Sequence, residues 1–519
     1  MFKRCLNILT LVLPAFFLFF FLSGVRFPAG FSLAHAGFFD FDLEIFEETL
    51  DLVEEKYVYP PDFKNLFSAA IEQMVKSADP ENLSADAAAG SVLYKNQSRL
   101  KYRLDYNRDN DTEAFKKVYY FLLDRYKGRV SKKDLEVAAI DGFVNALDPY
   151  SQYMDKETFD KSMKDTEGKY GGVGMVISMR DYKLVVVKIM RNSPAERAGI
   201  LPGDVFTKVD GRETRGLQIQ DLADLLRGEP NTKVSVSLLR PSDNVERAFT
   251  LTREIISVET VVYKPLRNNV AYIKISSFSK QTEDQLKEAL AKAQSGKARS
   301  IILDLRDNPG GLLDQSVKVA GYFLPRDHLV VYTQGRLKDD RSEFRSKSKN
   351  GRFNLPVVAL INHYSASASE IVVGSLKDWD KALVIGENSY GKGSVQTIFR
   401  ISDGSGLRLT TSKYFTPSGI DITKHGIAPD IAVIRDLPED KETASPLPPI
   451  EPKSPIPQRS QIQLKESELD RYLKEKGRIG EEEKDPLVNL ALLVLEDNSV
   501  PNKKRSMEKA RELAANIRY

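Results

Sequence analysis

Between residues 257 and 436, β-rich runs alternate with helical ones, and this alternation constrains the fold more than any other feature of the chain. Val270–Ile275 and Ser300–Leu305 are apolar runs typical of buried strands, whereas Thr282–Ala293 and Leu313–Tyr322 have helical spacing. Alternation of this kind favours a layered α/β domain, in which helices cover a sheet. The sequence therefore predicts an α/β core in this region.

Residues 37–165 are expected to be helical, and they contain an internal repeat. A shift of 69 residues superposes Phe46 on Phe115, Tyr57 on Tyr126, Leu66 on Leu135, Ala69-Ala70-Ile71 on Ala138-Ala139-Ile140, and Asp79-Pro80 on Asp148-Pro149. Each copy is expected to form two helices around a turn, as duplicated packing units do. The repeat fits either a doubled arm for self-association or partner binding, or a plain helical cap on the next domain.

Residues 168–256 have the composition of a small β domain. The runs Lys183–Lys188 and Lys233–Leu239 are β-rich, turn residues separate them, and Ile219–Leu226 is the one short helical stretch expected between them. The overall fold class is therefore multidomain α+β: an N-terminal helical region, a β domain, an α/β core and a C-terminal helical extension.

The β domain opens with a glycine-rich turn that leads into a strand. Its residues are Gly171, Gly172, Val173, Gly174 and Met175. Glycines let several backbone N–H groups point at one anion, and the next strand can accept an extended peptide at its edge. Together with the segment from Ser193 to Asp204, this turn resembles a PDZ domain. The resemblance implies a ligand that is the C-terminal carboxylate of a polypeptide.

The C-terminal part of the chain changes character twice. Residues 437–463 are rich in proline and charge, which is typical of an extended linker. Residues 464–519 return to charged helices and contain one apolar stripe, Leu487–Leu495. This stripe needs a partner surface, which either the body of this chain or a second copy could supply.

Residues 1–36 have the pattern of an export signal. Lys3 and Arg4 precede an apolar run from Leu6 to Leu22, and Ala34-His35-Ala36 supplies small residues at the cleavage positions. The alternative is an uncleaved anchor helix, although the run is at the lower limit for spanning a bilayer. Either alternative places the body of the chain outside the cytoplasm, in the periplasm or on the outer face of the inner membrane.

Charge and cysteine content exclude several classes of function. Lys3, Arg4 and Arg26 are the charged residues of the signal; without them Lys+Arg falls from 76 to 73 and equals Asp+Glu at 73. A general basic field for nucleic acid is therefore absent. The single cysteine, Cys5, lies in the signal, which excludes disulfides and cysteine chemistry from the exported part. We expect neither a cofactor nor a metal.

Two segments of the α/β core combine into a candidate catalytic site. The apolar strand Val357–Asn362 leads into Ser365, Ser367 and Ser369 at the start of a helix. A serine at such a junction lies close to helix N–H groups and suits a nucleophile, although on this segment alone helix capping is the better explanation of the three serines. The second segment places Lys392 between two glycines. Burial of its amine would favour the neutral form, which can act as a base.

These segments resemble the C-terminal processing proteases, also called tail-specific proteases. The resemblance rests on Asn362–Ile371, Gly391–Gln396, Asp304–Gly311, Tyr414–Gly419 and Gly426–Asp430, and it covers roughly residues 44–436. It implies a core of the crotonase or Clp-protease type. It also implies Ser367 as nucleophile, Lys392 as base 25 residues later, and Gln396 as third member. The N–H groups of Gly311 and Ala368 would form the oxyanion hole, with Gly311 preferred to Gly310.

The resemblance predicts a serine endopeptidase that acts on polypeptides with accessible C-termini. In the family the PDZ domain lies over the catalytic groove until a bound tail moves it. Helical arms at both ends favour a homo-oligomer, a dimer or higher, and an envelope adaptor protein could deliver substrates. Three alternatives remain. The glycines around Lys392 resemble a phosphate-binding loop, but Gly393 stands where a Ser or Thr is needed. His363 could face Ser367. Finally, the chain could be a non-catalytic peptide-binding scaffold.

Overall fold

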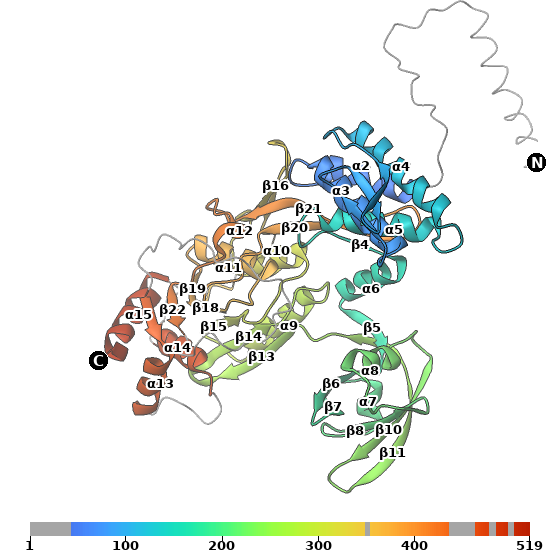
Figure 1. The fold of residues 1–519 in the computed structure, drawn as a ribbon. Coiled ribbons are helices and arrows are strands. Elements are labelled where there is room, and N and C mark those ends of the chain that lie inside the picture. The colour runs from blue at the N-terminus through green and yellow to red at the C-terminus, as the bar shows by residue number, and fades with distance from the viewer. Residues whose placement is uncertain (1–42, 348–352, 435–461, 477–483, 497–502, 519) are drawn as a thin grey trace, which may run out of the picture.

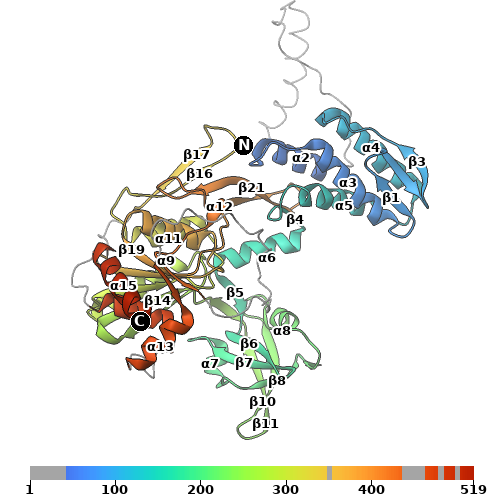
Figure 2. The same ribbon diagram turned by 60° about the vertical axis from the view of Figure 1, so that its left-hand side comes forward.

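The computed structural model describes residues 43–347, 353–434, 462–476, 484–496 and 503–518. The predicted export signal and most of the predicted linker, as far as residue 461, lie outside these ranges. Figures 1 and 2 show a central α/β core, with helices of the N-terminal region on one side and a small β domain that extends away from it. In the described residues no helix is long and apolar enough to cross a membrane.

The core is built on a seven-stranded sheet in the order β13-β14-β15-β18-β19-β22-β23. Neighbouring strands from β14 to β23 run parallel, whereas β13 pairs antiparallel with β14. The strands are β13 (Val261–Leu266), β14 (Val270–Ile275), β15 (Ser300–Asp304), β18 (Val357–Ile361), β19 (Ala382–Gly386), β22 (Ile431–Ile434) and β23 (Ile462–Lys465). The predicted α/β core is thus confirmed, and β14 has the bounds expected from its apolar run.

Helices cover both faces of this sheet, because successive strand residues point to opposite sides. Ile301 and Leu303 face the cluster formed with α9 (Thr282–Ser295), α10 (Leu313–Gly321) and α11 (Ala368–Asp378). Ile302 faces the other cluster, formed with α13 (Glu466–Glu475), α14 (Pro486–Leu495) and α15 (Lys503–Arg518). The apolar stripe of α14 therefore packs on the body of this chain.

The C-terminal region is part of the core rather than a separate extension. β23 adds to the sheet parallel to β22, with Ile462 opposite Ile431. β23 begins at Ile462, whereas the linker was expected to extend to residue 463. The expected end of the linker is therefore two residues too late. A four-residue strand after a proline-rich stretch is too short to stand out from its surroundings, and its pairing comes only from the tertiary fold.

A second sheet lies beside the core and carries the segment that follows Lys392. Its order is β17-β16-β21-β20, with β4 paired to β21. The strands are β16 (Leu329–Gln334), β17 (Arg341–Arg345), β20 (Ser394–Arg400), β21 (Gly406–Phe415) and β4 (Gln152–Met154). The short helix α12 (Ile422–His425) follows β21. Because β4 belongs to the N-terminal region, this sheet joins that region to the core.

The two copies of the repeat fold into one helical domain. They form α2 (Glu44–Lys56), α3 (Phe63–Ala78), α4 (Arg108–Arg125) and α5 (Lys132–Asn145), and α6 (Lys156–Glu167) leads onward. The equivalent residues Phe46 and Phe115 stack at the centre of this domain, with ring centroids 4.3 Å apart. The repeat is therefore a packing unit with the two copies face to face.

The purely helical reading of residues 37–165 is incomplete. A small antiparallel sheet, β1 (Leu83–Asp86), β2 (Ser91–Tyr94) and β3 (Gln97–Lys101), lies between the two copies. Leu83 and Val92 anchor it in the domain core, while most of β3 is exposed. Strands of four or five residues give little periodic signal.

Residues 168–256 form a separate β domain with its own apolar core. Its elements are β5 (Lys169–Gly172), β6 (Met175–Arg180), β7 (Lys183–Ile189), α7 (Pro194–Arg197), β8 (Val205–Val209), β9 (Arg212–Glu213), α8 (Ile219–Leu226), β10 (Lys233–Arg240), β11 (Val245–Thr252) and β12 (Glu254–Ser257). The ribbon of β5 and β12 connects this domain to the rest of the chain (Figure 1).

Candidate active site

Ser367 occupies a strained position at the start of α11. The parallel strand β18 ends at Ile361, and the chain turns sharply through the serine run before the helix begins at Ala368. Ser367 has φ 53° and ψ −112°, in a region that residues other than glycine rarely adopt. Such strain persists only where the surroundings fix it, and at a strand-to-helix turn it presents the hydroxyl beside the first helical N–H groups.

The other two serines have structural roles that Ser367 lacks. The Ser365 hydroxyl donates to the Leu305 carbonyl at 2.8 Å and accepts from the Asn362 N–H at 3.0 Å. The Ser369 hydroxyl donates to the Asn308 carbonyl at 3.0 Å. Both therefore fasten the start of α11 to the segment after β15. Neither hydroxyl accepts from an N–H of α11, whose N-cap is Ser367, so the capping interpretation does not hold for these two. Because both are committed to backbone carbonyls, Ser367 is the serine of the three that is left for chemistry.

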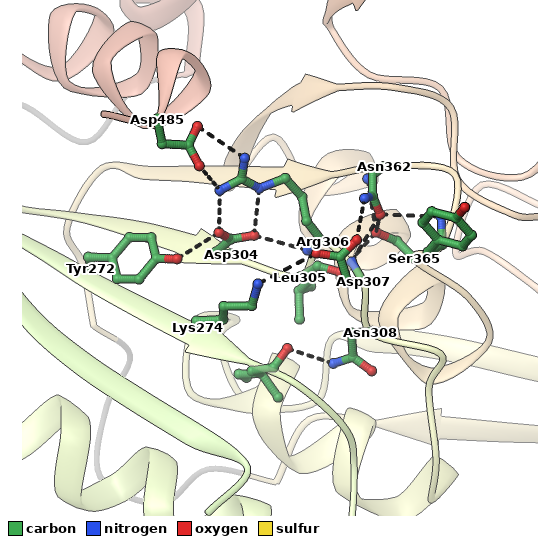
Figure 3. Close-up of polar contacts among 12 residues, drawn as sticks. Tyr272, Lys274, Asp304, Leu305, Arg306, Asp307, Asn308, Asn362, Ser365 and Asp485 are labelled. Atoms are coloured by element: carbon green, nitrogen blue, oxygen red, sulfur yellow. Dashed lines mark hydrogen bonds and ion pairs between the residues drawn. The ribbon is translucent and has the colours of Figure 1, made fainter. Parts of the chain in front are cut away.

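The segment after β15 is held by a buried ionic network (Figure 3). Arg306 Nη2 lies 2.6 Å from Asp304 and 2.7 Å from Asp485, the N-cap of α14. The Tyr272 hydroxyl donates to Asp304 at 2.7 Å. Burial alone would raise the pKa of Asp304, but its hydrogen bonds to Arg306 lower it. The C-terminal helices are thus connected directly to the segment that passes Ser367.

Beyond this network the chain passes Ser367 at close range. A Cβ atom at Gly310 would lie 2.8 Å from the Ser367 Cβ and 3.0 Å from the Ala368 nitrogen, so a side chain has no room there. The Gly310 N–H donates to Asn308 Oδ1 at 2.9 Å and is occupied. In the described residues the N–H groups of Gly311 and Ala368 donate to no acceptor. This arrangement agrees with the preference for Gly311 as oxyanion donor.

Lys392 lies in the loop before β20, with its ammonium 5.0 Å from the ring centroid of Tyr150. Burial and the nearby Arg408 guanidinium lower the pKa of Lys392, and the carboxylates of Glu370 and Asp148 oppose them. The direction is the one that a general base needs. Within the ranges described, no hydrogen bond joins Lys392 to Ser367, whose hydroxyl faces Tyr414 instead. The two side chains must therefore approach each other before proton transfer.

Glu370 ties the nucleophile and the base loop together. Its Oε2 accepts from the N–H groups of Ser367 at 2.7 Å and Lys392 at 2.9 Å. Its Oε1 accepts from the Ser389 hydroxyl at 2.5 Å and the Gly391 N–H at 2.6 Å. Burial raises the pKa of Glu370 to about 7, against the effect of these donors. Sequence reasoning assigned Glu370 no role in the site. Its position directly after the serine run was the available signal.

Gln396 has other partners than Lys392. Its Nε2 donates to Ser394 Oγ at 2.9 Å and to Thr410 Oγ1 at 3.4 Å. A shift of register between Val395 and Gln396 interrupts the regular pairing with β21. Lys392 itself lies before this strand and does not share a strand face with Gln396. Gln396 is therefore connected to the base only through its neighbours.

His363 has a carboxylate partner of its own. Its Nδ1 lies 2.8 Å from Glu387, on the protein surface. Within the part of the chain that the structure describes, no hydrogen bond joins His363 to Ser367. Among the residues described, no group of three or more acidic or histidine side chains is arranged to hold a metal ion.

The candidate peptide-binding turn lies at the edge of the β domain. Gly171 and Gly172 belong to β5 and pair with β12, so only Val173 and Gly174 form the connection to β6. β6 is the edge strand in the order β11-β10-β8-β7-β6. Val176 on β6 and Ile219 at the start of α8 are exposed apolar side chains beside this edge. An extended peptide can add to such an edge by main-chain hydrogen bonds.

Sequence reasoning missed the contribution of the N-terminal domain to this site. Tyr150 and Asp148 lie at the end of the second repeat, yet both affect Lys392. The repeat pointed to Asp148, since it aligns with Asp79, but no local pattern shows which end of the repeat faces the core.

Comparisons with known proteins agree with these features. Peptidase family S41 matches residues 269–433, a PDZ domain matches residues 185–240, and the N-terminal domain of the activating protease CtpB matches residues 82–158. The chain is similar to a carboxy-terminal-processing protease of Bartonella bacilliformis, with 39% identity over 58% of this chain and 70% of the relative. It is also similar to a probable CtpA-like serine protease of Staphylococcus haemolyticus, with 37% identity over 64% of this chain and 68% of the relative.

Among solved structures, a photosystem II D1 C-terminal processing protease aligns at 25% identity and a TM-score of 0.42, over 75% of this chain and 92% of that one. The assignment to a family rests on the sequence identity with the two proteases of Bartonella and Staphylococcus and on the share of their length that is covered. The chain belongs to the S41 peptidase family and is a carboxy-terminal-processing serine protease with a PDZ domain.

Proposed function

We propose that the chain is an exported endopeptidase in which Ser367 and Lys392 form the catalytic dyad and the PDZ domain captures the C-terminal tails of envelope proteins. The observation that carries the dyad is the contrast among the three serines. Ser365 and Ser369 are committed to backbone carbonyls, whereas Ser367 sits strained beside unoccupied N–H groups. The apolar run and small residues of positions 1–36 support export.

The proposed reaction is acyl transfer. Lys392 Nζ takes the proton of Ser367 Oγ, which attacks the carbonyl carbon of the substrate. The N–H groups of Gly311 and Ala368 donate to the oxyanion. The C–N bond then breaks, and the leaving amine takes the proton from Lys392. Water gives a proton to Lys392 and attacks the acyl carbon. The bond from this carbon to Ser367 Oγ then breaks, Oγ takes the proton back from Lys392, and the new carboxyl end of the product leaves. Gln396 supports the base through Ser394 and Thr410.

Recognition of the substrate tail is proposed for the edge of β6. The tail would add as an antiparallel strand, its carboxylate would meet the N–H groups at Val173 to Met175, and Val176 and Ile219 favour apolar or small final residues. A bound tail would move the PDZ domain relative to the catalytic groove and favour the approach of Lys392 to Ser367. Self-association through the helical arms and delivery by an envelope adaptor are further parts of the proposal.

Two versions of one quenched fluorescent peptide test this function. Both carry the same small and apolar final residues, but one ends in a free carboxylate and the other in an amide. We expect the free acid to be cleaved at least tenfold more efficiently, because the amide lacks the charge that the glycine turn binds. Ser367→Ala should cleave neither peptide and still bind the free acid. Equal cleavage of the two peptides would contradict tail recognition. A chain that binds tails but never cleaves them would be the non-catalytic scaffold.

A further inference from the structure

The turn that ends the second repeat lies against the loop that carries the proposed base. The ring of Tyr150 is the surface over which the Lys392 ammonium lies, at 5.0 Å from the centroid. The hydroxyl of Tyr150 hydrogen-bonds with that of Tyr390, two residues before Lys392. One side chain of the N-terminal domain thus contacts the base loop at two residues, Tyr390 and Lys392.

Asp148 fixes this turn and connects it to the second sheet. Its carboxylate accepts from the Tyr150 N–H at 2.8 Å, from the Ser151 N–H at 3.0 Å and from the Ser151 hydroxyl at 2.7 Å. It also accepts from Thr410 Oγ1 at 3.1 Å, and Thr410 is the residue that receives Gln396 Nε2. The Thr410 N–H donates back to Ser151 Oγ at 3.2 Å. A continuous set of hydrogen bonds therefore runs from the N-terminal domain to Gln396.

The charges that face Lys392 come from several elements. Arg408 of β21 and the burial of the amine disfavour the ammonium form. Glu370 of α11 and Asp148 of the turn favour it, and the Tyr150 ring offers a π face to the cation. The phenol of Tyr390, hydrogen-bonded to Tyr150, adds no charge at neutral pH because burial raises its pKa. The turn thus supplies two of the groups that stabilise a positive charge on Lys392.

We propose that Asp148 and Tyr150 are positioning residues of the active site, through which the N-terminal domain holds the base loop and stabilises the charge that Lys392 acquires in catalysis. This inference rests on the proposed function, since it gives a role to groups around the proposed base. It assigns to the second repeat a part in catalysis beyond that of a cap or an arm.

The internal repeat supplies a matched control. Asp79 is the equivalent of Asp148, and it too ends its copy with hydrogen bonds from the following residues: Asn82 Nδ2 donates to it at 2.9 Å and the Tyr126 hydroxyl at 3.4 Å. The strands that follow differ, however. β1 pairs with β2 of its own domain, whereas β4 pairs with β21 of the second sheet. Asp79 is therefore a carboxylate that fixes a turn in the same way as Asp148, but its turn lies in the part of the domain that does not contact the proposed active site.

The test compares Asp148→Asn with Asp79→Asn in the full chain, by steady-state cleavage of the quenched free-acid peptide between pH 5 and 10. Loss of the Asp148 charge makes the ammonium less stable, so Lys392 should deprotonate at lower pH and act as a weaker base. We expect the acid limb of kcat to move to lower pH, and kcat on the plateau to fall about tenfold with KM unchanged. Asp79→Asn should keep the wild-type limb and kcat.

Tyr150 gives a second and independent arm. Tyr150→Leu removes both the π face and the hydrogen bond to Tyr390 and should lower kcat by about tenfold, whereas Tyr150→Phe removes only the hydrogen bond and should lower kcat less. Melting temperatures of all variants separate this effect from unfolding. An unmoved limb in Asp148→Asn, or equal kcat in Tyr150→Leu and wild type, would overturn the inference while the proposed function stands. A wild-type chain without Ser367-dependent cleavage would overturn the proposed function and the inference together.

Discussion

Replacement of Ser367 by alanine is expected to abolish peptide cleavage, with a loss of at least about 10⁴-fold in kcat. The reason is local, since Ser367 is the serine of the three whose hydroxyl is free of backbone carbonyls and lies beside the proposed oxyanion donors. Steady-state hydrolysis of the free-acid peptide measures the loss. The fold should survive, because the residue's structural bond, from its N–H to Glu370, does not involve the side chain.

Ser365→Ala is the matched control for that substitution. It removes the same atom two residues earlier, but it deprives the buried Asn362 N–H of the Ser365 hydroxyl and leaves the Leu305 carbonyl with the Asn308 N–H at 3.4 Å. We expect a loss of about 1–3 kcal/mol in the free energy of unfolding, with cleavage retained below the melting temperature. If Ser365→Ala were inactive while fully folded, and Ser367→Ala active, the assignment of the nucleophile would be wrong.

Arg306→Ala is expected to cause the largest loss of stability. Asp304 is fully buried, and without the guanidinium its charge keeps only Tyr272 and one backbone N–H. Breaking a buried ion pair in this way costs about 3–5 kcal/mol. Because the pKa of Asp304 is lowered by Arg306, the stability it contributes is present above the ordinary carboxyl pKa and is lost as pH falls through the lowered one. The difference from wild type should therefore shrink in acid.

Denaturant unfolding at pH 7 and at pH 3 checks this expectation. Arg345→Ala serves as control, since Arg345 forms an exposed pair with Glu343 that should be worth less than about 1 kcal/mol. Arg306 also contacts Asp485, so we expect its loss to release α14 from the sheet and to reduce cleavage. Equal and small effects of the two substitutions would show that the buried network does not hold the segment after β15.

The sequence predicted the parts of this protein whose signal is local. The apolar run Val270–Ile275 indicated β14 with the correct bounds. For the apolar stripe of α14 the sequence left two possible partner surfaces, and the structure shows that the stripe packs on the body of this chain. Ser367 and Lys392 were assigned through the family resemblance. In this structure the Ser367 hydroxyl faces Tyr414 and the Lys392 amine lies over the Tyr150 ring. No local sequence pattern indicates either contact.

What the sequence did not reveal depends on contacts between distant segments. Arg306 and Asp485 are 179 residues apart, and either alone reads as a surface charge. The strand β1 was missed because its four residues contain a single large apolar side chain, Leu83, and so give no clear period. Tyr150 was missed because its distance from Lys392 is set by the packing of a whole domain. Each of these features depends on the tertiary structure. In a different fold the same residue types could equally be exposed to solvent.

The central claim is that a neutral Lys392 activates Ser367, and the pH dependence of Ser367 acylation tests it most directly. A fluorophosphonate probe would be reacted with the wild-type chain and with Lys392→Ala between pH 5 and 10, and the labelled residue identified by mass spectrometry. We expect the wild-type chain to be labelled at Ser367, with a rate that rises with pH and reaches a plateau below the ordinary lysine pKa. The plateau lies there because burial and the Arg408 guanidinium lower the pKa of Lys392. Lys392→Ala should remain unlabelled. A flat profile, or Ser367 labelled equally well without Lys392, would contradict the claim.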